Sequence, residues 1–271
     1  MNRLRQVFET QRVELAHAVV ACRNHARPKS VHALRTLTRR MEACLRAIAE
    51  EHSRTHRLTG AARKLIKTLN LLRKASGRVR DLDVQSKLIL ELAGQGRGHA
   101  HTTNDADAER IRSLCKERRK DAADKFRKLL TSHEIKLERG LEAVAMALEG
   151  SRRQEAAPAV MAARWMRKTV RSDKKLSKNA LHDFRKQTKL ARYLAEMQPD
   201  SQQAAKLAKE LHAVQDAIGK WHDLDLLIGV IKPALGKHVS LRRQAQLSRR
   251  NALRAARTLL LSHAGTFRKQ R

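Results

Sequence analysis

Apolar residues recur every three or four positions along most of the chain, the spacing that places them on one face of an α-helix. Within residues 30–51, for example, Leu34, Met41 and Leu45 share such a face. Glycine and proline, the residues that interrupt helices, number only 11 and 4 in 271 residues. The pattern predicts an all-α fold with helices over residues 3–24, 30–51, 56–76, 79–93, 105–149, 156–175, 179–197, 201–219, 222–231 and 237–262.

Two polar, glycine-containing stretches separate groups of periodic segments. Residues 94–108 predict a solvated loop, and His99 and His101 within it are interpreted as loop residues rather than metal ligands. Residues 149–158 predict a boundary, after which Pro158 suits the first turn of a helix. We therefore expect two helical halves, residues 1–150 and 151–271, that together form one unit.

Two polar signatures occur twice in the same order, which indicates an internal repeat. The first, H-x-x-R-x-x-x-(R/K), lies in VHALRTLTRR (31–40) and in LHDFRKQTKLARY (181–193). The second lies in ASGRVRDLDV (75–84) and in AIGKWHDLDL (217–226). The alignment pairs His32 with His182, Arg35 with Arg185, Arg39 with Lys189, Gly77 with Gly219, Asp81 with Asp223 and Asp83 with Asp225.

Positive charge changes the picture from a plain helical protein to one that attracts polyanions. Lys and Arg number 59 against 27 Asp and Glu, a formal net charge of +32, and both halves are basic. Because 41% of the residues are hydrophobic, the charge belongs to a chain that can bury a core. Nucleic acid, an anionic membrane surface or another phosphate polymer are the partners that such an excess fits.

The basic residues of each repeat lie on helix faces opposite the apolar ones. At about 100° per residue, Arg35 and Arg39 fall within roughly 60° of His32. These faces are expected to lack the acidic partners at i,i+4 that stabilise an ordinary solvated face, which favours an anion site. A row of such donors suits an extended chain of phosphates, because arginine grips phosphate oxygens in pairs and histidine beside an anion gains a proton. The same reasoning in the second helix of each signature pair selects Arg63, Lys67, Lys74, Lys209 and Lys220.

Four carboxylates follow the conserved spacing of the second signature: Asp81, Asp83, Asp223 and Asp225. One interpretation is a metal site, since carboxylates bind divalent cations. We favour the other, that they cap a helix and orient neighbouring arginines, because alternate residues of a helix point in different directions. "HDLD" also suggests a metal-dependent phosphohydrolase, but Arg80 replaces His222 in the first copy. No other catalytic motif is present, so neither an enzyme nor a cofactor or metal is expected.

Cys22, Cys44 and Cys115 have no metal-ligand spacing and fall in predicted helices, which favours buried free thiols in a reducing compartment. The first residues lack an apolar targeting segment, and no apolar run reaches the roughly 20 residues of a membrane helix. We expect a cytoplasmic protein with no membrane partner.

The four signature segments resemble those of the CHAD domain, the conserved histidine α-helical domain, over residues 5–262. The resemblance implies two pseudo-symmetric antiparallel helical bundles around a basic groove. It also implies binding of inorganic polyphosphate, in some bacterial members at polyphosphate granules. The family usually has arginine where this chain has Glu42. The binding residues implied by position are His32, Arg35, Arg39, Arg40, Arg46, His182, Arg185, Lys186, Lys189 and Arg192.

Together, these patterns predict non-catalytic binding of polyphosphate between two helical bundles. The alternative is a nonspecific nucleic-acid-binding protein, for which the charge is equally suitable and which we expect to show DNA binding at low salt. Against it, two Trp, one Tyr and four Phe offer few surfaces for base stacking. A second alternative is a phosphohydrolase that uses the four aspartates.

Overall fold

Helices account for all the regular structure in the part of the chain that the computed structural model describes, residues 3–95, 101–149, 157–172, 178–236 and 239–269. They are α1 (Arg3–Asn24), α2 (Pro28–Glu51), α3 (His56–Gln95), α4 (His101–Glu149), α5 (Pro158–Ser172), α6 (Lys178–Ala195), α7 (Gln202–Leu235) and α8 (Ser240–Lys269). The predicted all-α fold is confirmed.

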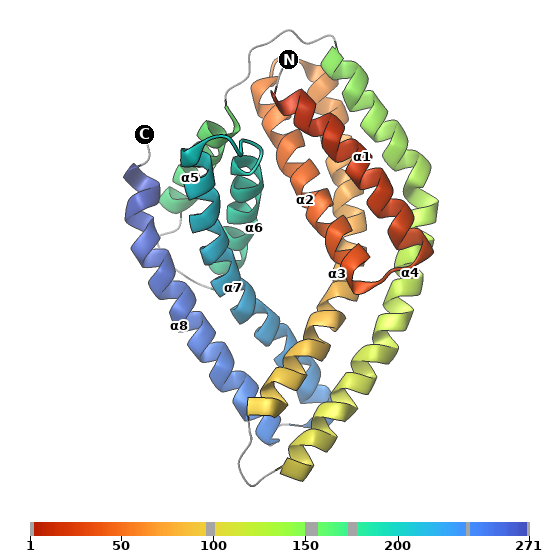
Figure 1. Ribbon diagram of the computed structural model, residues 1–271, viewed down its shortest axis with the longest axis vertical. Coiled ribbons are helices and arrows are strands. Elements are labelled where there is room, and N and C mark those ends of the chain that lie inside the picture. Colours follow the sequence, from red (N-terminus) through yellow and green to blue (C-terminus); the bar gives the residue numbers. More distant parts are fainter. Residues whose placement is uncertain (1–2, 96–100, 150–156, 173–177, 237–238, 270–271) are drawn as a thin grey trace.

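The helices form two sets that face each other (Figure 1). Each helix of α1–α4 packs against the next, and so does each helix of α5–α8. Between the sets, α2 packs against α6, while the long helices α3 and α4 extend to reach α7 and α8 at the lower tip in Figure 1. Residues far apart in the sequence therefore approach each other where α2 and α3 face α6 and α7.

Apolar stripes predicted from the pattern form the core. Leu34 and Leu45 of α2, Leu69 of α3, and Leu211 and Val214 of α7 are fully buried. Burial of each such side chain contributes about 1.5–3 kcal/mol, which fixes the rotation of its helix and thereby directs the opposite, basic face. The three cysteines are free and buried, as predicted.

Two predicted helix breaks are wrong. The pattern placed breaks at residues 77–78 and 220–221, but α3 runs unbroken through Gly77 and α7 through Gly219. An interior glycine costs only about 1 kcal/mol relative to alanine. Burial on the same helices, at Val79 and at Trp221 for instance, outweighs that cost.

The predicted loop at residues 94–108 is also wrong at both ends. Residues 94–95 belong to α3, and α4 begins at His101; residues 96–100, with His99, lie outside the described residues. The helix extends this far because Ala108 and Ile111 already pack into the core. Pro158 begins α5, as predicted, although most of the predicted boundary lies outside the described residues.

Candidate functional site

The basic face of α2 points toward α3 and α6. On its other face, Met41 and Leu45 are fully buried. Arg35 is half-buried, and its Nη1 donates a hydrogen bond of 2.8 Å to the backbone carbonyl of Arg73 on α3. Burial, followed by the charge of Arg39, lowers the pKa of Arg35 to about 10. The guanidinium is thus held against α3 in surroundings that disfavour its charge.

Gly77, inside α3, leaves the space that this guanidinium fills. A Cβ atom at Gly77 would lie 2.6 Å from Nη1 of Arg35, far inside van der Waals contact. At the matching position of the second half, a Cβ atom on Gly219 would meet nothing within 4 Å. The glycine of the repeated signature therefore has a steric role in the first half.

Arg185 and Lys189 approach the same region from α6. Burial, then the charges of Arg39, Arg185 and Arg80, lower the pKa of Lys189 to about 5. Burial lowers the pKa of Arg185 to about 10, although the charge of Asp223 opposes the change. The Nε atom of Arg185 is buried and has no hydrogen-bond partner among the described residues. Basic side chains from both halves therefore lie close together, and the charges of the arginines among them are incompletely compensated.

Arg80 connects the two halves directly. Its Nη1 and Nη2 donate hydrogen bonds of 2.9 and 3.2 Å to the two carboxylate oxygens of Asp223 on α7. Its Nη1 also donates to Asp81, at 3.3 Å. Burial acts to lower the pKa of Arg80, but these hydrogen bonds and carboxylate charges outweigh it and raise the pKa. Arg80 consequently stays charged and spans α3 and α7.

Three imidazoles border these cations. The ring centroids of His182 and His222 are 5.2 Å apart. Burial and the charge of Arg185 lower the pKa of His222 to about 4. Burial also lowers the pKa of His182 and of His32, and in His32 the charge of Arg80 adds to the effect. At neutral pH, the imidazoles are uncharged and can each accept a proton.

We call this group of basic side chains the cation cluster. It comprises His32, Arg35, Arg39, Arg73, Arg80, His182, Arg185, Lys189 and His222. Asp81 and Asp223 are the carboxylates that face it, and Glu42 pairs with Arg73 at its edge. Partly buried cations in excess over carboxylates cost free energy, and an anion that accepts their hydrogen bonds removes that cost.

Tyr193 of α6 closes one end of the cluster. It is buried, its hydroxyl hydrogen-bonds to Arg39, and the Cζ atoms of Arg192 and Arg40 lie 4.6 and 5.9 Å from its ring centroid. Guanidinium groups at such distances interact favourably with an aromatic face. The ring therefore gives both guanidinium groups a favourable contact at this end of the cluster.

The described residues contain no group of three His, Cys, Asp or Glu side chains close enough to hold a metal ion. They also contain no helix with the length and apolar character needed to cross a membrane.

The family model of the CHAD domain matches residues 6–232, which is most of the chain. The chain belongs to the CHAD domain family. Among curated proteins, none matches it.

Two solved structures share this CHAD fold. PptA from Streptomyces chartreusis superposes with a TM-score of 0.69, covering 97% of this chain and 98% of that chain at 14% identity. The CHAD domain from the plant Ricinus communis gives a TM-score of 0.67, covering 99% of this chain and 91% of that chain at 18% identity. At these identities, the likeness shows the fold alone.

The binding residues predicted from the helix faces and from the CHAD resemblance fall into two groups in this structure. Those at the centre of the two signatures come together in the cation cluster: His32, Arg35, Arg39, His182, Arg185 and Lys189. The rest lie outside it. Lys67, Lys74, Lys209 and Lys220 are exposed, Lys186 is exposed and pairs with Asp183, and Arg46 and Arg63 line a separate pocket.

Arg40 and Arg192 lie at the edge of the cation cluster. Arg40 pairs with Glu196 at 3.3 Å and thereby joins α2 to α6, while Arg192 contacts Nδ1 of His212 at 2.6 Å. Both also flank the ring of Tyr193. They stabilise the end of the cluster where α2 meets α6.

The expectation that the basic faces lack acidic partners is wrong at their outer ends. Glu42 accepts a hydrogen bond of 2.9 Å from Nε of Arg46, and Nε of Arg192 lies 3.3 Å from Glu196. Aligning His32 with His182 pairs Glu42 with Arg192 and Arg46 with Glu196. Each half thus has an ion pair at the same i,i+4 positions, with the charges exchanged.

The four aspartates of the second signature do not cap helices, because α3 and α7 continue through them. Asp83 accepts hydrogen bonds from Arg119 of α4, and Asp225 accepts one of 2.5 Å from Arg249 of α8. The second aspartate of each pair therefore contacts the neighbouring helix of its own half, while the first faces the cluster.

Arg73, Arg80, His222 and Tyr193 belong to the site, but the sequence analysis did not assign them to it. The signal that could have found Arg80 and His222 is their shared position immediately before the first aspartate of each signature. Arg73 lies seven residues before Arg80 and therefore on the same face of α3. Nothing in the repeat marks Arg73, since Gln215 occupies the matching position.

Proposed function

We propose that this CHAD protein binds inorganic polyphosphate at the cation cluster, in a basic groove between the two bundles, and does so without catalysis. The observation that carries the proposal is the concentration of half-buried arginines from α2, α3 and α6, in excess over the carboxylates beside them. Only an anion of high charge density supplies acceptors to several such groups at once. We further propose that this binding places the protein in the cytoplasm, at polyphosphate granules.

A linear phosphate polymer fits this arrangement better than a nucleic acid does. The cluster contains arginine, lysine and histidine but no Phe, Tyr or Trp, and Tyr193 at its end is buried against Arg192 and Arg40. Bases would find no exposed Phe, Tyr or Trp side chain among these residues on which to stack. Duplex DNA remains the competitor to test, because the net charge of +32 attracts any polyanion.

The test is competition at physiological salt. Labelled long-chain polyphosphate is bound to the protein, and unlabelled polyphosphate or duplex DNA is added at equal phosphate concentration. We expect polyphosphate to displace the label at a concentration at least about tenfold lower than DNA, a difference of about 1.4 kcal/mol. Equal displacement by DNA would contradict the proposal and favour the nucleic-acid alternative.

Two further measurements complete this test. Affinity for polyphosphate should fall steeply between about 50 and 200 mM salt, because each neutralised phosphate releases a condensed counterion. Incubation with polyphosphate and Mg²⁺ or Mn²⁺ should release no orthophosphate; metal-dependent release would establish the phosphohydrolase alternative instead.

A further inference from the structure

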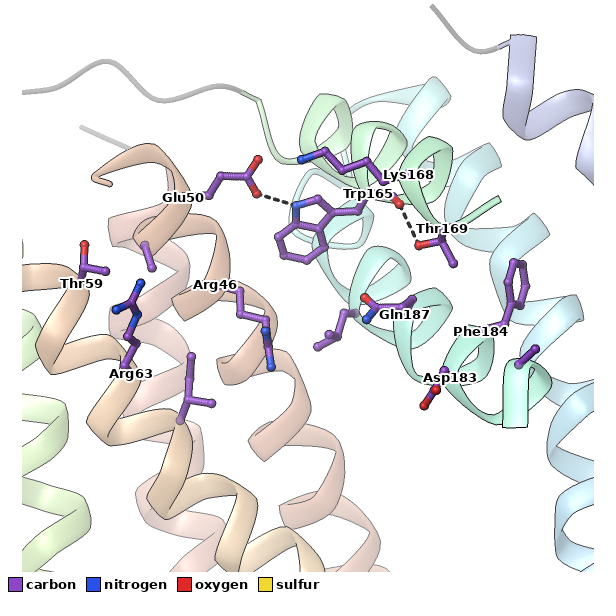
Figure 2. A pocket seen from close by; sticks show the side chains of 14 residues that line it. Arg46, Glu50, Thr59, Arg63, Trp165, Lys168, Thr169, Asp183, Phe184 and Gln187 are labelled. Atoms are coloured by element: carbon purple, nitrogen blue, oxygen red, sulfur yellow. Dashed lines mark hydrogen bonds between the residues drawn. The ribbon is translucent and has the colours of Figure 1, made fainter. Parts of the chain in front are cut away.

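A pocket of about 800 Å³ lies between α2 and α3 of one half and α5 and α6 of the other, outside the cation cluster. Figure 2 shows its walls, with Arg63 and Arg46 on one side and Trp165 and Gln187 on the other. Gln187 is two residues from both Arg185 and Lys189 along α6, which turns it roughly 160° away from those two side chains. The pocket therefore faces away from the cluster.

The indole of Trp165 provides a fixed aromatic surface on this pocket. Its Nε1 donates a hydrogen bond of 2.7 Å to Glu50 of α2, drawn as a dashed line in Figure 2. Nη1 of Arg164 lies 3.4 Å from the other oxygen of the same carboxylate. Because Glu50 is held in this way, it fixes the orientation of the ring before any ligand binds, so stacking on the ring costs little entropy.

The remaining lining combines apolar side chains, polar ones such as Thr59, one carboxylate (Asp183, which pairs with Lys186) and two unpaired cations. Phe184 and Leu190 contribute apolar surface from α6. Arg63 of α3 and Lys168 of α5 are exposed and make no ion pair with any described residue. The third cation, Arg46, already pairs with Glu42. Inorganic polyphosphate would leave the aromatic and apolar wall unmatched, whereas a purely apolar ligand would leave the cations unmatched.

We propose that this pocket is a second binding site, for a nucleoside phosphate. The base stacks against Trp165, and the phosphates lie between Arg63 and Lys168. Stacking of a base on an aromatic side chain and pairing of phosphate with arginine or lysine are the two interactions that such a ligand requires. The volume lies within the range of small-molecule pockets, about 300–1,000 Å³.

ADP is a suitable probe, with adenosine and inorganic tripolyphosphate as its separate parts. Equilibrium dialysis of labelled ADP against the full-length protein should show saturable binding. Trp165→Leu, and Arg63→Ala combined with Lys168→Ala, should each weaken ADP binding about tenfold or more, the equivalent of one stacked base. Trp165→Phe retains a ring and should retain most of the affinity. Adenosine and tripolyphosphate should each compete at least about tenfold less well than ADP.

Fluorescence gives an independent reading of the same site. In a Trp221→Phe background, Trp165 is the sole tryptophan, and ADP should quench its emission with the dissociation constant found by dialysis. Absence of saturable ADP binding to the unsubstituted protein would overturn the proposal. So would ADP binding that survives Trp165→Leu but is lost in Arg185→Gln combined with Lys189→Gln, because ADP would then occupy the cation cluster.

The two proposed sites can fail separately. Trp165 belongs to the pocket alone, so Trp165→Leu should leave the affinity for long-chain polyphosphate unchanged. Loss of ADP binding in this variant with normal polyphosphate binding supports two sites. Equal loss of both ligands would contradict the separation of the pocket from the cluster.

Discussion

The ammonium group of Lys189 is strongly disfavoured in the folded protein. Burial comes first among the causes, and Arg39, Arg185 and Arg80 face the same amine from α2, α6 and α3, with the single opposing charge of Asp223 on α7. The pKa falls from its ordinary value of 10.5 to about 5, so the folded state binds one proton fewer than the unfolded chain between these limits. The unfolded state binds more protons there, so stability rises with pH across this window.

Removing the amine should therefore stabilise the fold. For Lys189→Met, we expect the free energy of unfolding at neutral pH to rise by about 1–4 kcal/mol, since each unit of pKa depression represents about 1.4 kcal/mol. Thermal unfolding should shift upward by at least about 2 °C. The advantage over the natural protein should shrink as the pH is raised from about 6 to 9. A lower melting temperature would show that Lys189 has a stabilising partner instead.

Polyphosphate binding should take up protons. A polyanion at the cluster raises the pKa of Lys189 and of the imidazoles of His32, His182 and His222, all of which are lowered in the free protein. Affinity should thus decrease as the pH rises from about 5 to 8. Calorimetry at neutral pH in two buffers of different ionisation enthalpy measures the uptake directly. Lys189→Met should reduce it by about one proton, and an unchanged value would contradict protonation of Lys189.

Gly77 and Gly219 offer a matched pair of substitutions. Gly77→Ala should displace the Arg35 guanidinium, because the new Cβ would lie 2.6 Å from Nη1, whereas Gly219→Ala meets nothing within 4 Å. Alanine favours a helix interior over glycine by about 1 kcal/mol, so both variants should fold. We expect polyphosphate affinity to fall severalfold for Gly77→Ala and to stay unchanged for Gly219→Ala. Equal affinities, measured by the same titration, would show that the position of Arg35 is unimportant.

At the level of helices, the contact of α3 with α7 depends on a buried charge pair. The carboxylate of Asp223 is only 14% exposed and accepts two hydrogen bonds from Arg80. Breaking such a pair on one side leaves the other charge in poorly solvated surroundings. The pair therefore holds the two helices in one relative position and keeps the Arg80 guanidinium aimed across the cluster.

Asp223→Asn should destabilise the protein by about 1–3 kcal/mol, because charge-assisted hydrogen bonds are replaced by weaker ones. Chemical denaturation with a two-state fit measures the change. Asp225→Asn provides the comparison, since Asp225 is 39% exposed and pairs with Arg249 of α8. The loss should be smaller there. A loss at Asp225 equal to or larger than that at Asp223 would contradict the role assigned to the contact between halves.

Periodicity predicted the helices well where apolar residues repeat and failed where a single residue type was taken as a stop. Leu34, Met41 and Leu45 are buried as their spacing predicts. Gly77 does not end its helix, because burial of residues such as Val79 outweighs the cost of an interior glycine, and Arg35 of another helix fills the space it leaves, a contact between residues distant in the sequence. Local patterns contain no information about such a contact.

The site was predictable only as far as the repeat marks it. Arg35 and Arg185 were found because both signatures contain them, and they do meet at the cluster. Arg63 and Lys67 were selected because they lie opposite the apolar stripe of their helix, yet both are exposed outside the cluster. Which of several neighbouring cations faces the partner half depends on how the helices pack, and a helical wheel of one segment does not contain that packing.

The fold of the whole molecule places two rows of basic side chains, one from each half, on opposite sides of the cluster; we call each row a wall. Arg35 and Arg39 come from the first half, and Arg185 and Lys189 from the second. A polymer long enough to contact both walls binds the second wall at a high effective concentration, whereas a short one gains less. The affinity should therefore depend on chain length only while both walls are intact.

Neutralising either wall tests this coupling. Arg35→Gln with Arg39→Gln should weaken binding of long-chain polyphosphate at least about tenfold more than binding of tripolyphosphate, and Arg185→Gln with Lys189→Gln should do the same. The control is Arg250→Gln with Arg254→Gln, which replaces the same number of basic side chains at exposed positions of α8. If the control weakens long-chain binding as much as either wall variant, the protein binds through its net charge alone.

The contact between α3 and α7 has the form of an isologous dimer interface. Arg80 meets Asp223, and its counterpart His222 lies within the electrostatic influence of Asp81, the counterpart of Asp223. The residue before the first aspartate of each signature thus lies near the first aspartate of the other signature. The same reciprocal arrangement occurs between two identical subunits related by a two-fold axis. Such an interface would also work between two identical subunits with one signature each. In this single chain the two halves differ, and one contributes an arginine where the other contributes a titratable histidine.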